Sequence, residues 1–316
     1  MDPWNQAVFP ELQTVREIVA FTNSEIQHPE MRAMLEYSTT NIGKMFRSSL
    51  FFMFYKMGDK VITEKITNIG ASIELIHLVT LIHDDINDKS EYRHGKRSLH
   101  VAYSIPKAIA VGDFLLAKAF QLSCDVPNDV ISLNSAIAEK ITVGEFKQED
   151  QLHNMDTTLD DYYDIIGNKT ASFFSSCCKA GAQLWADNEE LVNDAAMFGY
   201  HYGLAFQIED DIIDITAAIN DSGKDNLRDL NLGNYTIPII MALNTESGDE
   251  LSNLLSSGAG PEIIAKKVLE TDSISKCRTL LEEEREMCIR SLNSFEDSEY
   301  KIGLKALVDS LGTRMK

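Results

Sequence analysis

Proline is nearly absent from the middle of this 316-residue sequence. The chain contains seven prolines, and none of them lies between Pro127 and Pro238. Proline breaks a helix interior because it lacks a backbone donor and clashes with the preceding turn, so a long proline-free stretch favours consecutive helices over a turn-rich β protein. Alternation of period two is scarce, and no repeat or low-complexity tract is present. The sequence therefore predicts an all-α chain.

Apolar residues between positions 64 and 85 recur with the helical period. They lie mostly three or four positions apart, which is typical of the buried stripe of a helix: Ile66, Ile69, Ile73, Ile76, Val79 and Leu81. The best candidates for loops in the second half are residues 220–226 (NDSGKDN) and Ser256–Pro261 (SSGAGP), and neither resembles a domain linker. We therefore expect a single domain over residues 1–316, a large helical bundle.

Composition excludes some classes of partner. A formal net charge of −20 disfavours non-specific binding of nucleic acid, which needs clustered Lys and Arg. Five cysteines without a CxxC pair are typical of free thiols in a reducing compartment. The start, MDPWNQ, lacks a basic and then apolar signal, and no run approaches the roughly 18 apolar residues of a spanning helix. We expect a cytoplasmic protein with no nucleic-acid partner and at most peripheral membrane contact.

Two clusters of aspartate follow apolar stretches. LIHDDINDKSEYRHGKRSLH, residues 81–100, contains Asp84, Asp85 and Asp88. FQIEDDIID repeats the spacing with its own three aspartates: Asp210, Asp211 and Asp214. A solvated acidic face is the ordinary explanation of one cluster, but two clusters, each followed by basic residues, indicate a shared site. Carboxylates on two helices facing a cavity suit Mg²⁺, which shares its coordination sites with water and substrate phosphates.

The ordered motifs of the chain resemble those of the trans-prenyltransferases, the polyprenyl diphosphate synthases of the isoprenoid synthase fold. The resemblance runs from about Gly43 to about Pro238. Its segments follow the family's order: Gly43–Arg47 (GKMFR), Glu74–His77, His83–Asp88, Arg93–Lys96, Gly112–Leu116, Gly144–Glu145, Lys169–Thr170, Phe206–Gln207, Asp210–Asp214, Gly223–Lys224 and Asp229–Leu230.

The resemblance implies a fold with a central active-site cavity, the chemistry and the site. Family members ionise an allylic diphosphate and join the cation to isopentenyl diphosphate, so catalysis holds the charge of the leaving diphosphate. It implies Mg²⁺, three ions with substrate bound, held by Asp84, Asp88 and Asp210, with Asp85, Asp211 and Asp214 in support. The residues implied for the allylic diphosphate are Arg93, Lys169, Thr170, Gln207 and Lys224. Those implied for isopentenyl diphosphate are Lys44, Arg47, His77 and His94. The resemblance also implies that Lys169 and Lys224 act in catalysis together with the aspartates Asp84, Asp85, Asp88 and Asp210.

Outside this ordered set the same residue types have plainer explanations. A lone lysine is ordinarily a solvated charge, and a histidine within an apolar helix is ordinarily a hydrogen-bonded core residue. We expect four tyrosines to be packing residues: Tyr162, Tyr163, Tyr200 and Tyr202.

Two positions depart from the family pattern. His94 stands where most members have a second arginine, and histidine cannot make the bidentate contact of a guanidinium. Asn234 stands where a lysine is usual, and Leu227 replaces a glycine. Both changes of charge predict weaker substrate binding, and the sequence leaves open whether Lys96 or Arg97 compensates.

Product length is expected to depend on the helix that precedes the first cluster. In the family, the residue five positions before the first aspartate limits chain growth. Here Val79 holds that position, with Thr80 after it and Ile76 one turn deeper. Valine is neither bulky nor small, so we expect a medium or long product, from geranylgeranyl to about heptaprenyl diphosphate.

Two other functions fit parts of the sequence. A class I terpene cyclase shares the fold and one DDxxD, but would usually lack GKxxR and the second cluster. A catalytic or regulatory subunit of a heteromeric synthase, inactive alone, is favoured by the departures at His94 and Asn234. The resemblance also implies a homodimer through helices near Gly112–Leu116.

Overall fold

The computed structural model describes residues 3–24, 26–40, 42–93, 95–124, 128–217 and 227–313, with only the backbone for 128–134. Within these ranges nearly all regular structure is helical, so the all-α prediction is confirmed. The exception is one antiparallel hairpin, in which β1 (Tyr92–Arg93) pairs with β2 (Lys96–Arg97). All five cysteines are free, as predicted.

Contacts divide the chain into two compact units. The first comprises residues 1–138, 177–192 and 296–304, and the second comprises 139–176, 193–295 and 305–316. The expectation of one domain over residues 1–316 stays a prediction. The helices are α1 (Pro3–Gln6), α2 (Phe9–Phe21), α3 (Pro29–Thr39), α4 (Phe46–Lys56), α5 (Glu64–Asn87), α6 (Leu99–Ala102), α7 (Ile105–Leu122), α8 (Asn128–Asp150), α9 (Leu159–Ile166), the π-helical turn η1 (Gly167–Ala171), α10 (Ser172–Gln183), α11 (Glu189–Ala217), α12 (Arg228–Leu232), α13 (Ile237–Leu243), α14 (Gly248–Ser256), α15 (Pro261–Leu269), α16 (Ser273–Ser291) and α17 (Glu299–Ser310).

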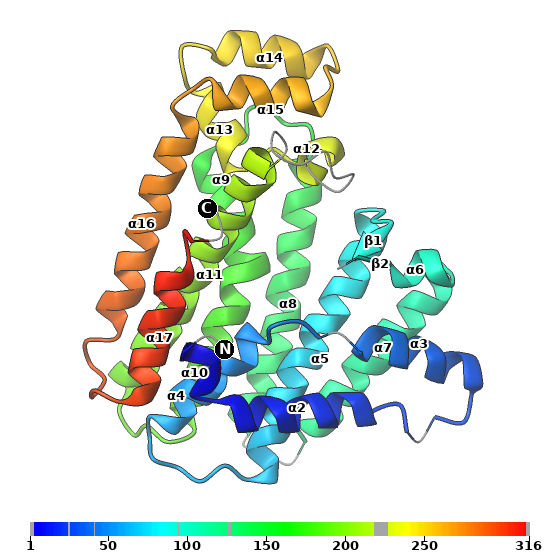
Figure 1. Cartoon of the computed structure of the whole chain (residues 1–316), viewed down its shortest axis with the longest axis vertical. Helices are drawn as coiled ribbons and strands as arrows, with labels where there is room; N and C mark the ends of the chain where they lie inside the picture. Colours follow the sequence, from blue (N-terminus) through cyan, green and yellow to red (C-terminus); the bar gives the residue numbers. More distant parts are fainter. Residues whose placement is uncertain are drawn as a thin grey trace. The chain divides into compact units, whose positions relative to one another are not determined.

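Helix α5 forms the core of the first unit. The predicted stripe is buried from Ile66 to Val79, while Leu81 is half-buried. Helix α7 runs antiparallel beside α5 (Figure 1). Gly112 of α7 leaves room for the His83 ring, and the Ser123 hydroxyl donates to the Ser72 hydroxyl across the same interface. A Cβ at Gly112 would come within 2.4 Å of His83 Nε2, so any larger residue there would have to displace the His83 ring.

Helix α5 is also long and apolar enough to cross a membrane by length and composition. No helix that could cross a membrane was predicted from the sequence. Most of the apolar stretch, 72%, is buried within the protein. This burial is that of a core helix, because a spanning helix would direct its apolar surface outward to lipid.

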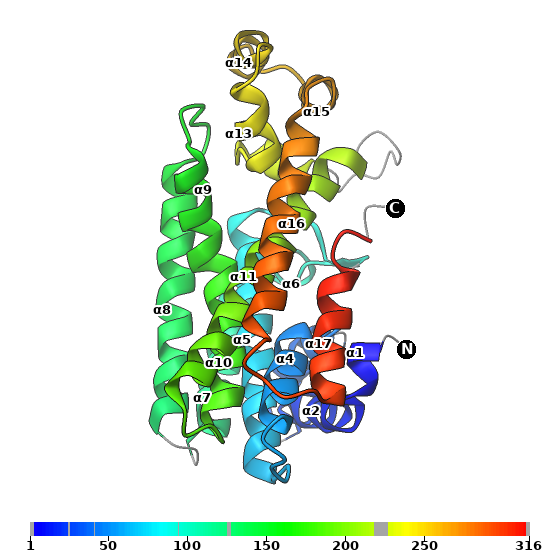
Figure 2. The same cartoon turned by 90° about the vertical axis from the view of Figure 1, so that its left-hand side faces the viewer.

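The second unit has its own apolar cluster where α11, α13, α14 and α15 meet. Its members are buried residues of these helices and the neighbouring segment: Ile215, Leu227, Leu230, Tyr235, Ile239, Ala242, Leu251, Ile264, Ala265 and Val268. Figure 2 shows α14 and α15 together at the end of α16. The predicted loop at Ser256–Pro261 joins α14 to α15, with Pro261 as the first helical residue, while the predicted loop at 220–226 lies outside the described residues.

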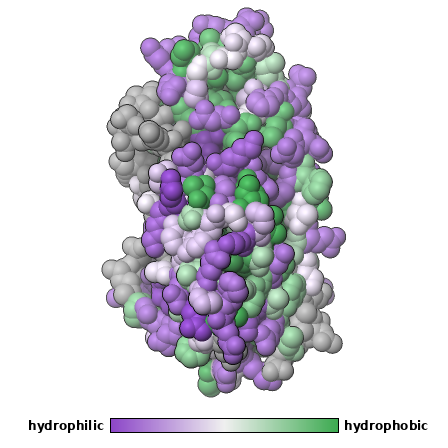
Figure 3. Space-filling view, turned by 90° about the vertical axis from the view of Figure 1, so that its right-hand side faces the viewer, coloured by the Kyte–Doolittle hydropathy of each residue, from purple (hydrophilic) through white to green (hydrophobic). Residues whose placement is uncertain are grey.

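The surface of the protein carries both hydrophilic and hydrophobic side chains. Figure 3 shows one face of the molecule on which hydrophilic side chains predominate and hydrophobic ones form scattered groups. Isolated apolar residues are normal on a protein surface, whereas one large apolar patch would indicate a binding surface.

Candidate active site

The first aspartate cluster ends helix α5. Asp84 and Asp85 occupy its last turn, and Asp88 is the C-terminal cap residue. The carbonyl end of a helix carries partial negative charge, so three carboxylates there are unfavourable unless cations offset them. Asp85 is 5% exposed and accepts from Arg93, at 3.0 Å from Nε and 2.6 Å from Nη2. Asp84 and Asp88 are half-buried.

Arg93 therefore holds the middle aspartate in this structure. The hairpin of β1 and β2 places it there, and a pocket of about 70 Å³ is lined by Asp85 and Arg93 together with Lys96 and Arg97. The family resemblance implied that Arg93 binds the allylic diphosphate, and the ion pair of Arg93 with Asp85 was not predicted. His94, also assigned to substrate, lies outside the described residues.

A second group of predicted residues gathers at the start of α4. Arg47 Nη1 lies 3.1 Å from His77 Nε2. Because a guanidinium only donates, His77 Nε2 must accept, which makes the imidazole neutral with its proton on Nδ1. Lys44 is exposed and sits just before α4, after Gly43, whose φ of +70° is in the left-handed region. Two cations beside a helix N-terminus form a favourable setting for phosphate.

Next to this group lies a carboxyl that sequence reasoning did not single out. Glu74 is 2% exposed and accepts from Ser48, from its backbone N–H at 3.1 Å and from its hydroxyl at 2.6 Å. Burial raises the pKa of Glu74, whereas the two bonds from Ser48 and the charge of Arg47 lower it. Its place in an apolar helix was the available signal, since a buried carboxyl requires partners.

The second aspartate cluster lies in the last turns of α11, in the second unit. Asp211 is 2% exposed and accepts from Gln207 Nε2 at 2.9 Å and from the Tyr162 hydroxyl at 2.7 Å. Gln207 in turn accepts from the Thr170 hydroxyl at 3.1 Å. Thr170 and Gln207, both predicted to bind the allylic diphosphate, are thus hydrogen-bonded to each other, whereas Tyr162, expected to be a packing residue, is a hydrogen-bond donor to the cluster.

The electrostatics of this cluster disfavour ionisation. Burial, and then the charges of Asp229 and Asp210, raise the pKa of Asp211, and the bonds from Tyr162 and Gln207 oppose that rise. Burial and Asp229 also raise the pKa of Asp214, to about 6, although its carboxylate accepts from the Leu227 backbone N–H at 3.0 Å.

Asn234, the second departure from the family pattern, contacts the same group. Its side-chain amide donates to Asp229 Oδ1 at 2.8 Å. Leu227, the other departure, has a φ of +60°, in the left-handed region that glycine adopts without strain. The chain therefore keeps the backbone conformation suited to glycine at a position where it has leucine.

Lys169 lies in the π turn η1 and contacts α8. Its Nζ lies 2.7 Å from Glu145 Oε1 and 3.3 Å from Gln148 Oε1. The structure thus pairs a predicted diphosphate contact with a carboxylate of the second unit. Lys224, the other predicted catalytic lysine, lies outside the described residues.

The three residues predicted to set product length lie on the first unit's core helix. Ile76 and Val79 are buried, and Thr80 is half-buried with its hydroxyl bonded to the His77 carbonyl at 2.8 Å. The contacts of His83 with Gly112 and of Ser72 with Ser123 run in one antiparallel register. Leu116 of α7 therefore lies across from Val79.

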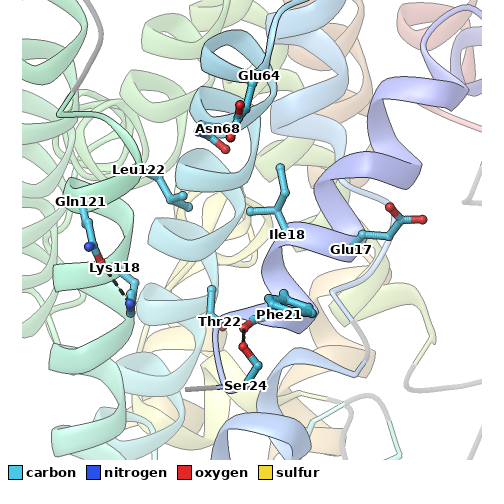
Figure 4. Close-up of a pocket in the computed structure, with 10 residues that line it drawn as sticks. All are labelled: Glu17, Ile18, Phe21, Thr22, Ser24, Glu64, Asn68, Lys118, Gln121 and Leu122. Carbon is cyan, nitrogen blue, oxygen red and sulfur yellow. Dashed lines mark hydrogen bonds between the residues drawn. The ribbon is translucent and has the colours of Figure 1, made fainter. Parts of the chain in front are cut away.

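One pocket of the first unit is separate from these residues. A pocket of about 540 Å³ lies between α2, α5 and α7 (Figure 4), with apolar side chains such as Ile18 and Leu122 and polar ones such as Asn68 and Lys118. Asn68 precedes Asp84 by more than four turns of α5, about 24 Å at the helical rise. The lining of this pocket contains none of the predicted site residues, and the pocket lies at the opposite end of α5 from Asp84.

A metal site made by protein alone is absent from the part of the chain that the structure describes: no three His, Cys, Asp or Glu side chains are grouped to hold an ion. Mg²⁺ is usually bound by one or two carboxylates plus substrate phosphates and water. The donor chemistry of Asp84, Asp88 and Asp210, all half-buried carboxylates, suits that cation.

Comparison with known proteins agrees with these observations. The family model described as polyprenyl synthetase matches residues 28–271. A prenyl transferase of Cyanophora paradoxa is 32% identical over 89% of this chain and 88% of its own length. Solanesyl diphosphate synthase 2 of Arabidopsis thaliana, a chloroplastic protein, is 31% identical over 89% of this chain and 70% of its own.

Two further similarities bear on assembly and fold. Component 2 of the heptaprenyl diphosphate synthase of Bacillus subtilis is 28% identical over 86% of this chain and 79% of its own length. The crystal structure of a decaprenyl diphosphate synthase from Rhodobacter capsulatus, 24% identical, superimposes with a TM-score of 0.91 over 99% of this chain and 98% of its own, which shows the shared all-α fold. The chain belongs to the polyprenyl synthetase family and is a prenyltransferase, a polyprenyl diphosphate synthase.

Proposed function

We propose that the chain condenses isopentenyl diphosphate head to tail with an allylic diphosphate in a Mg²⁺-dependent reaction. The observation that carries this proposal is an arrangement of buried and half-buried aspartates that both clusters share. In each cluster the middle aspartate, Asp85 or Asp211, is buried and held by side-chain donors, while Asp84, Asp88 and Asp210 remain half-buried. Two clusters built this way support ligation by the half-buried members.

The allylic diphosphate is the substrate that must lose its C–O bond. Bound Mg²⁺, three ions in our proposal, would supply the positive charge that stabilises the leaving diphosphate. Fixed cations add to it, and we assign this role to Arg93, Lys169 and Lys224, with Thr170 and Gln207 as neutral donors. Glu145 holds Lys169 in place and would be replaced by diphosphate oxygen when substrate binds.

Isopentenyl diphosphate must not ionise, so side chains without bridging metal suit it. We assign Lys44, Arg47 and His77 to this substrate, at the N-terminal end of α4. The position of His94 belongs to the same set. Lys96 and Arg97, which line the small pocket beside Arg93, add positive charge there but do not replace the guanidinium contact that is usual at position 94.

Product length follows from the burial of Val79. Its side chain and Ile76 lie on one side of α5 opposite the turn of α7 that carries Leu116, so a growing tail on this face meets medium-sized side chains. The solanesyl and heptaprenyl names of the relatives support a medium or long product. We propose a product from geranylgeranyl to about heptaprenyl diphosphate.

Assembly is proposed on similar grounds. Helix α7 exposes Ile105 and Ile109, which supports a homodimer through this helix. The Bacillus subtilis relative is named as one component of its synthase, so a small partner subunit is the second candidate. We propose a cytoplasmic protein that contacts membranes at most peripherally, through its lipophilic product.

The experiment uses the purified chain with Mg²⁺, labelled isopentenyl diphosphate and farnesyl diphosphate, with products resolved by length. We expect a defined prenyl diphosphate that disappears with chelator. Asp84→Ala and Asp210→Ala should each lower turnover at least about 100-fold, since each removes charge stabilisation at the reacting diphosphate, while Asp187→Ala, at an exposed aspartate, retains activity. Silence with every allylic primer would favour the partner-dependent subunit. Near-normal rates in the first two variants would refute the metal assignment.

A further inference from the structure

The helix that carries Lys169 and Thr170 is interrupted by a π turn. Helices α9 and α10 are joined without a loop by η1, and the Ser172 backbone N–H donates to the Gly167 carbonyl five residues back. A π turn is rare and is found mostly as a single turn at functional sites, because it inserts an extra residue and redirects the side chains that follow. Both residues of the predicted Lys169–Thr170 pair lie within it.

Two side chains, one inside the π turn and one directly after it, bond to main-chain carbonyls. Asn168 Nδ2 donates to the Asp164 carbonyl at 2.7 Å, and the Ser172 hydroxyl donates to the Asn168 carbonyl at 2.7 Å. These bonds occupy carbonyls where the regular i to i−4 ladder is interrupted. The local sequence thus stabilises the π turn itself.

Two glycines on other helices contact the backbone of the turn. A Cβ at Gly144 of α8 would lie 2.8 Å from the Lys169 nitrogen and 3.0 Å from its Cα. A Cβ at Gly203 of α11 would lie 2.5 Å from the Ala171 Cα. In both cases the nearest atoms are backbone, which cannot swing aside as a long side chain can. Helices α8 and α11 therefore approach the turn this closely only because these positions lack a side chain.

The same two helices supply the partners of the turn's side chains. Lys169 contacts Glu145, the residue after Gly144, and Thr170 bonds to Gln207, one turn beyond Gly203. Each glycine contact therefore sits beside a polar contact of the π turn. On each of the two helices, the glycine that limits the distance to the π turn lies near the residue that holds the side chain of Lys169 or Thr170.

We propose that Gly144 and Gly203 are positioning residues that clamp the π turn and thereby set where Lys169 and Thr170 meet a diphosphate. The inference rests on the proposed function, which assigns both side chains to the allylic diphosphate. Neither glycine contacts substrate. Their effect passes through the backbone of the turn, so a methyl group at either position displaces the turn and with it the two side chains.

The test compares Gly144→Ala and Gly203→Ala with two other alanine substitutions in the second unit. Gly199→Ala is equally crowded, since its Cβ would lie 2.4 Å from the Phe174 carbonyl, but it contacts regular α10 rather than the π turn. Gly260→Ala meets only the end of a flexible glutamate, at 3.4 Å. We expect the two clamp variants to raise KM for the allylic diphosphate about 10- to 100-fold, the range for small misplacements near a reacting group, and KM for isopentenyl diphosphate less than about twofold.

A second pair of variants adds no volume. Ser172→Ala removes the bond to the Asn168 carbonyl in the π turn, and Ser176→Ala removes the same type of bond, to the Ser172 carbonyl at 2.8 Å, one turn later in regular helix. We expect Ser172→Ala to raise the allylic KM and Ser176→Ala to leave it unchanged. This pair tests the clamp even if crowding prevents the glycine variants from folding.

Calorimetric binding of inorganic pyrophosphate with Mg²⁺ gives a reading that is independent of turnover. The clamp variants should bind it at least about tenfold more weakly than the wild type, with the Gly199 and Gly260 variants unchanged. A uniform loss of thermal stability with unchanged KM and pyrophosphate affinity would overturn the inference and leave the proposed function intact. A wild type that neither turns over nor binds pyrophosphate would overturn both.

Discussion

Removal of the Tyr162 hydroxyl is the change that tests the structure most directly. It donates to Asp211 at 2.7 Å, from α9 to α11, and Asp211 is almost fully buried. The other donor to this carboxylate among the described residues is Gln207. Tyr162→Phe keeps the ring and removes one of these two donors, so the variant isolates the hydrogen bond from the packing.

The expected cost follows from the charge of the acceptor. A hydrogen bond to a charged group contributes about 1.5–3 kcal/mol, and a buried oxygen that loses its donor is costly because water cannot replace it. We therefore expect Tyr162→Phe to lower the free energy of unfolding by about 1.5–3 kcal/mol. For domains of about 150–250 residues such a change lowers Tm by about 2–4 °C per kcal/mol, so the shift is easily measured.

The pH dependence has a definite sign. Burial raises the pKa of Asp211 above its value in the unfolded chain, so the stability from this group is fully present below the unfolded pKa and decreases as pH rises through the folded pKa. Tyr162 opposes that decrease because its bond favours the ionised form. The penalty of Tyr162→Phe should therefore be largest above the folded pKa and smallest in acid.

Thermal and denaturant unfolding at acidic and mildly alkaline pH provide the assay. Tyr163→Phe is the matched control, because its ring stands edge-on to Tyr162 at 5.8 Å and it is half-buried, but its hydroxyl does not bond to Asp211. Equal stability of Tyr162→Phe and wild type at alkaline pH would refute the reasoning. So would a penalty that grows in acid.

The remaining predictions concern substrates and product. Val79→Tyr should shorten the product and Val79→Ala should lengthen it, because the side chain is buried on the face assigned to the tail; an unchanged length distribution in both would place the limit elsewhere. His94→Arg should lower KM for isopentenyl diphosphate about tenfold, a gain of about 1.4 kcal/mol from one guanidinium contact; steady-state kinetics showing no change would mean that Lys96 and Arg97 already suffice. Asn234→Lys should lower the pKa of Asp214, now raised to about 6, because it brings a cation to Asp229; carboxyl titration by NMR that finds the same pKa would contradict this.

Local sequence predicted what depends on local periodicity. The stripe from Ile66 to Val79 predicted the buried face of α5, and the aspartates that follow it, Asp84, Asp85 and Asp88, lie at the C-terminal end of the same helix. Helical spacing is a property of neighbouring residues, so it can be read without knowing the rest of the fold. The same holds for the loop at Ser256–Pro261.

Partners from distant segments were beyond such reading. Tyr162 precedes Asp211 by 49 positions, and nothing in its neighbours distinguishes a tyrosine that donates to a carboxylate from one that only packs. Glu74 receives its bonds from Ser48 on another helix. Lys169 pairs with Glu145 of another helix, and the glycines proposed to position the π turn lie on α8 and α11. These features arise from tertiary contacts, which family motifs indicate only as a list of positions.

The charges around the two aspartate clusters differ between the two units. In the first unit a protein cation, Arg93, neutralises the buried Asp85. In the second unit the groups that act on Asp211 are two neutral donors and two carboxylates, Asp229 and Asp210, and their net effect with burial is a raised pKa. A carboxylate in that state binds a divalent cation in competition with a proton. On the proposed function, we therefore expect the second cluster to depend more strongly on Mg²⁺ for its ionised form than the first, and the neutral amide of Asn234, where a lysine is usual, to increase that dependence.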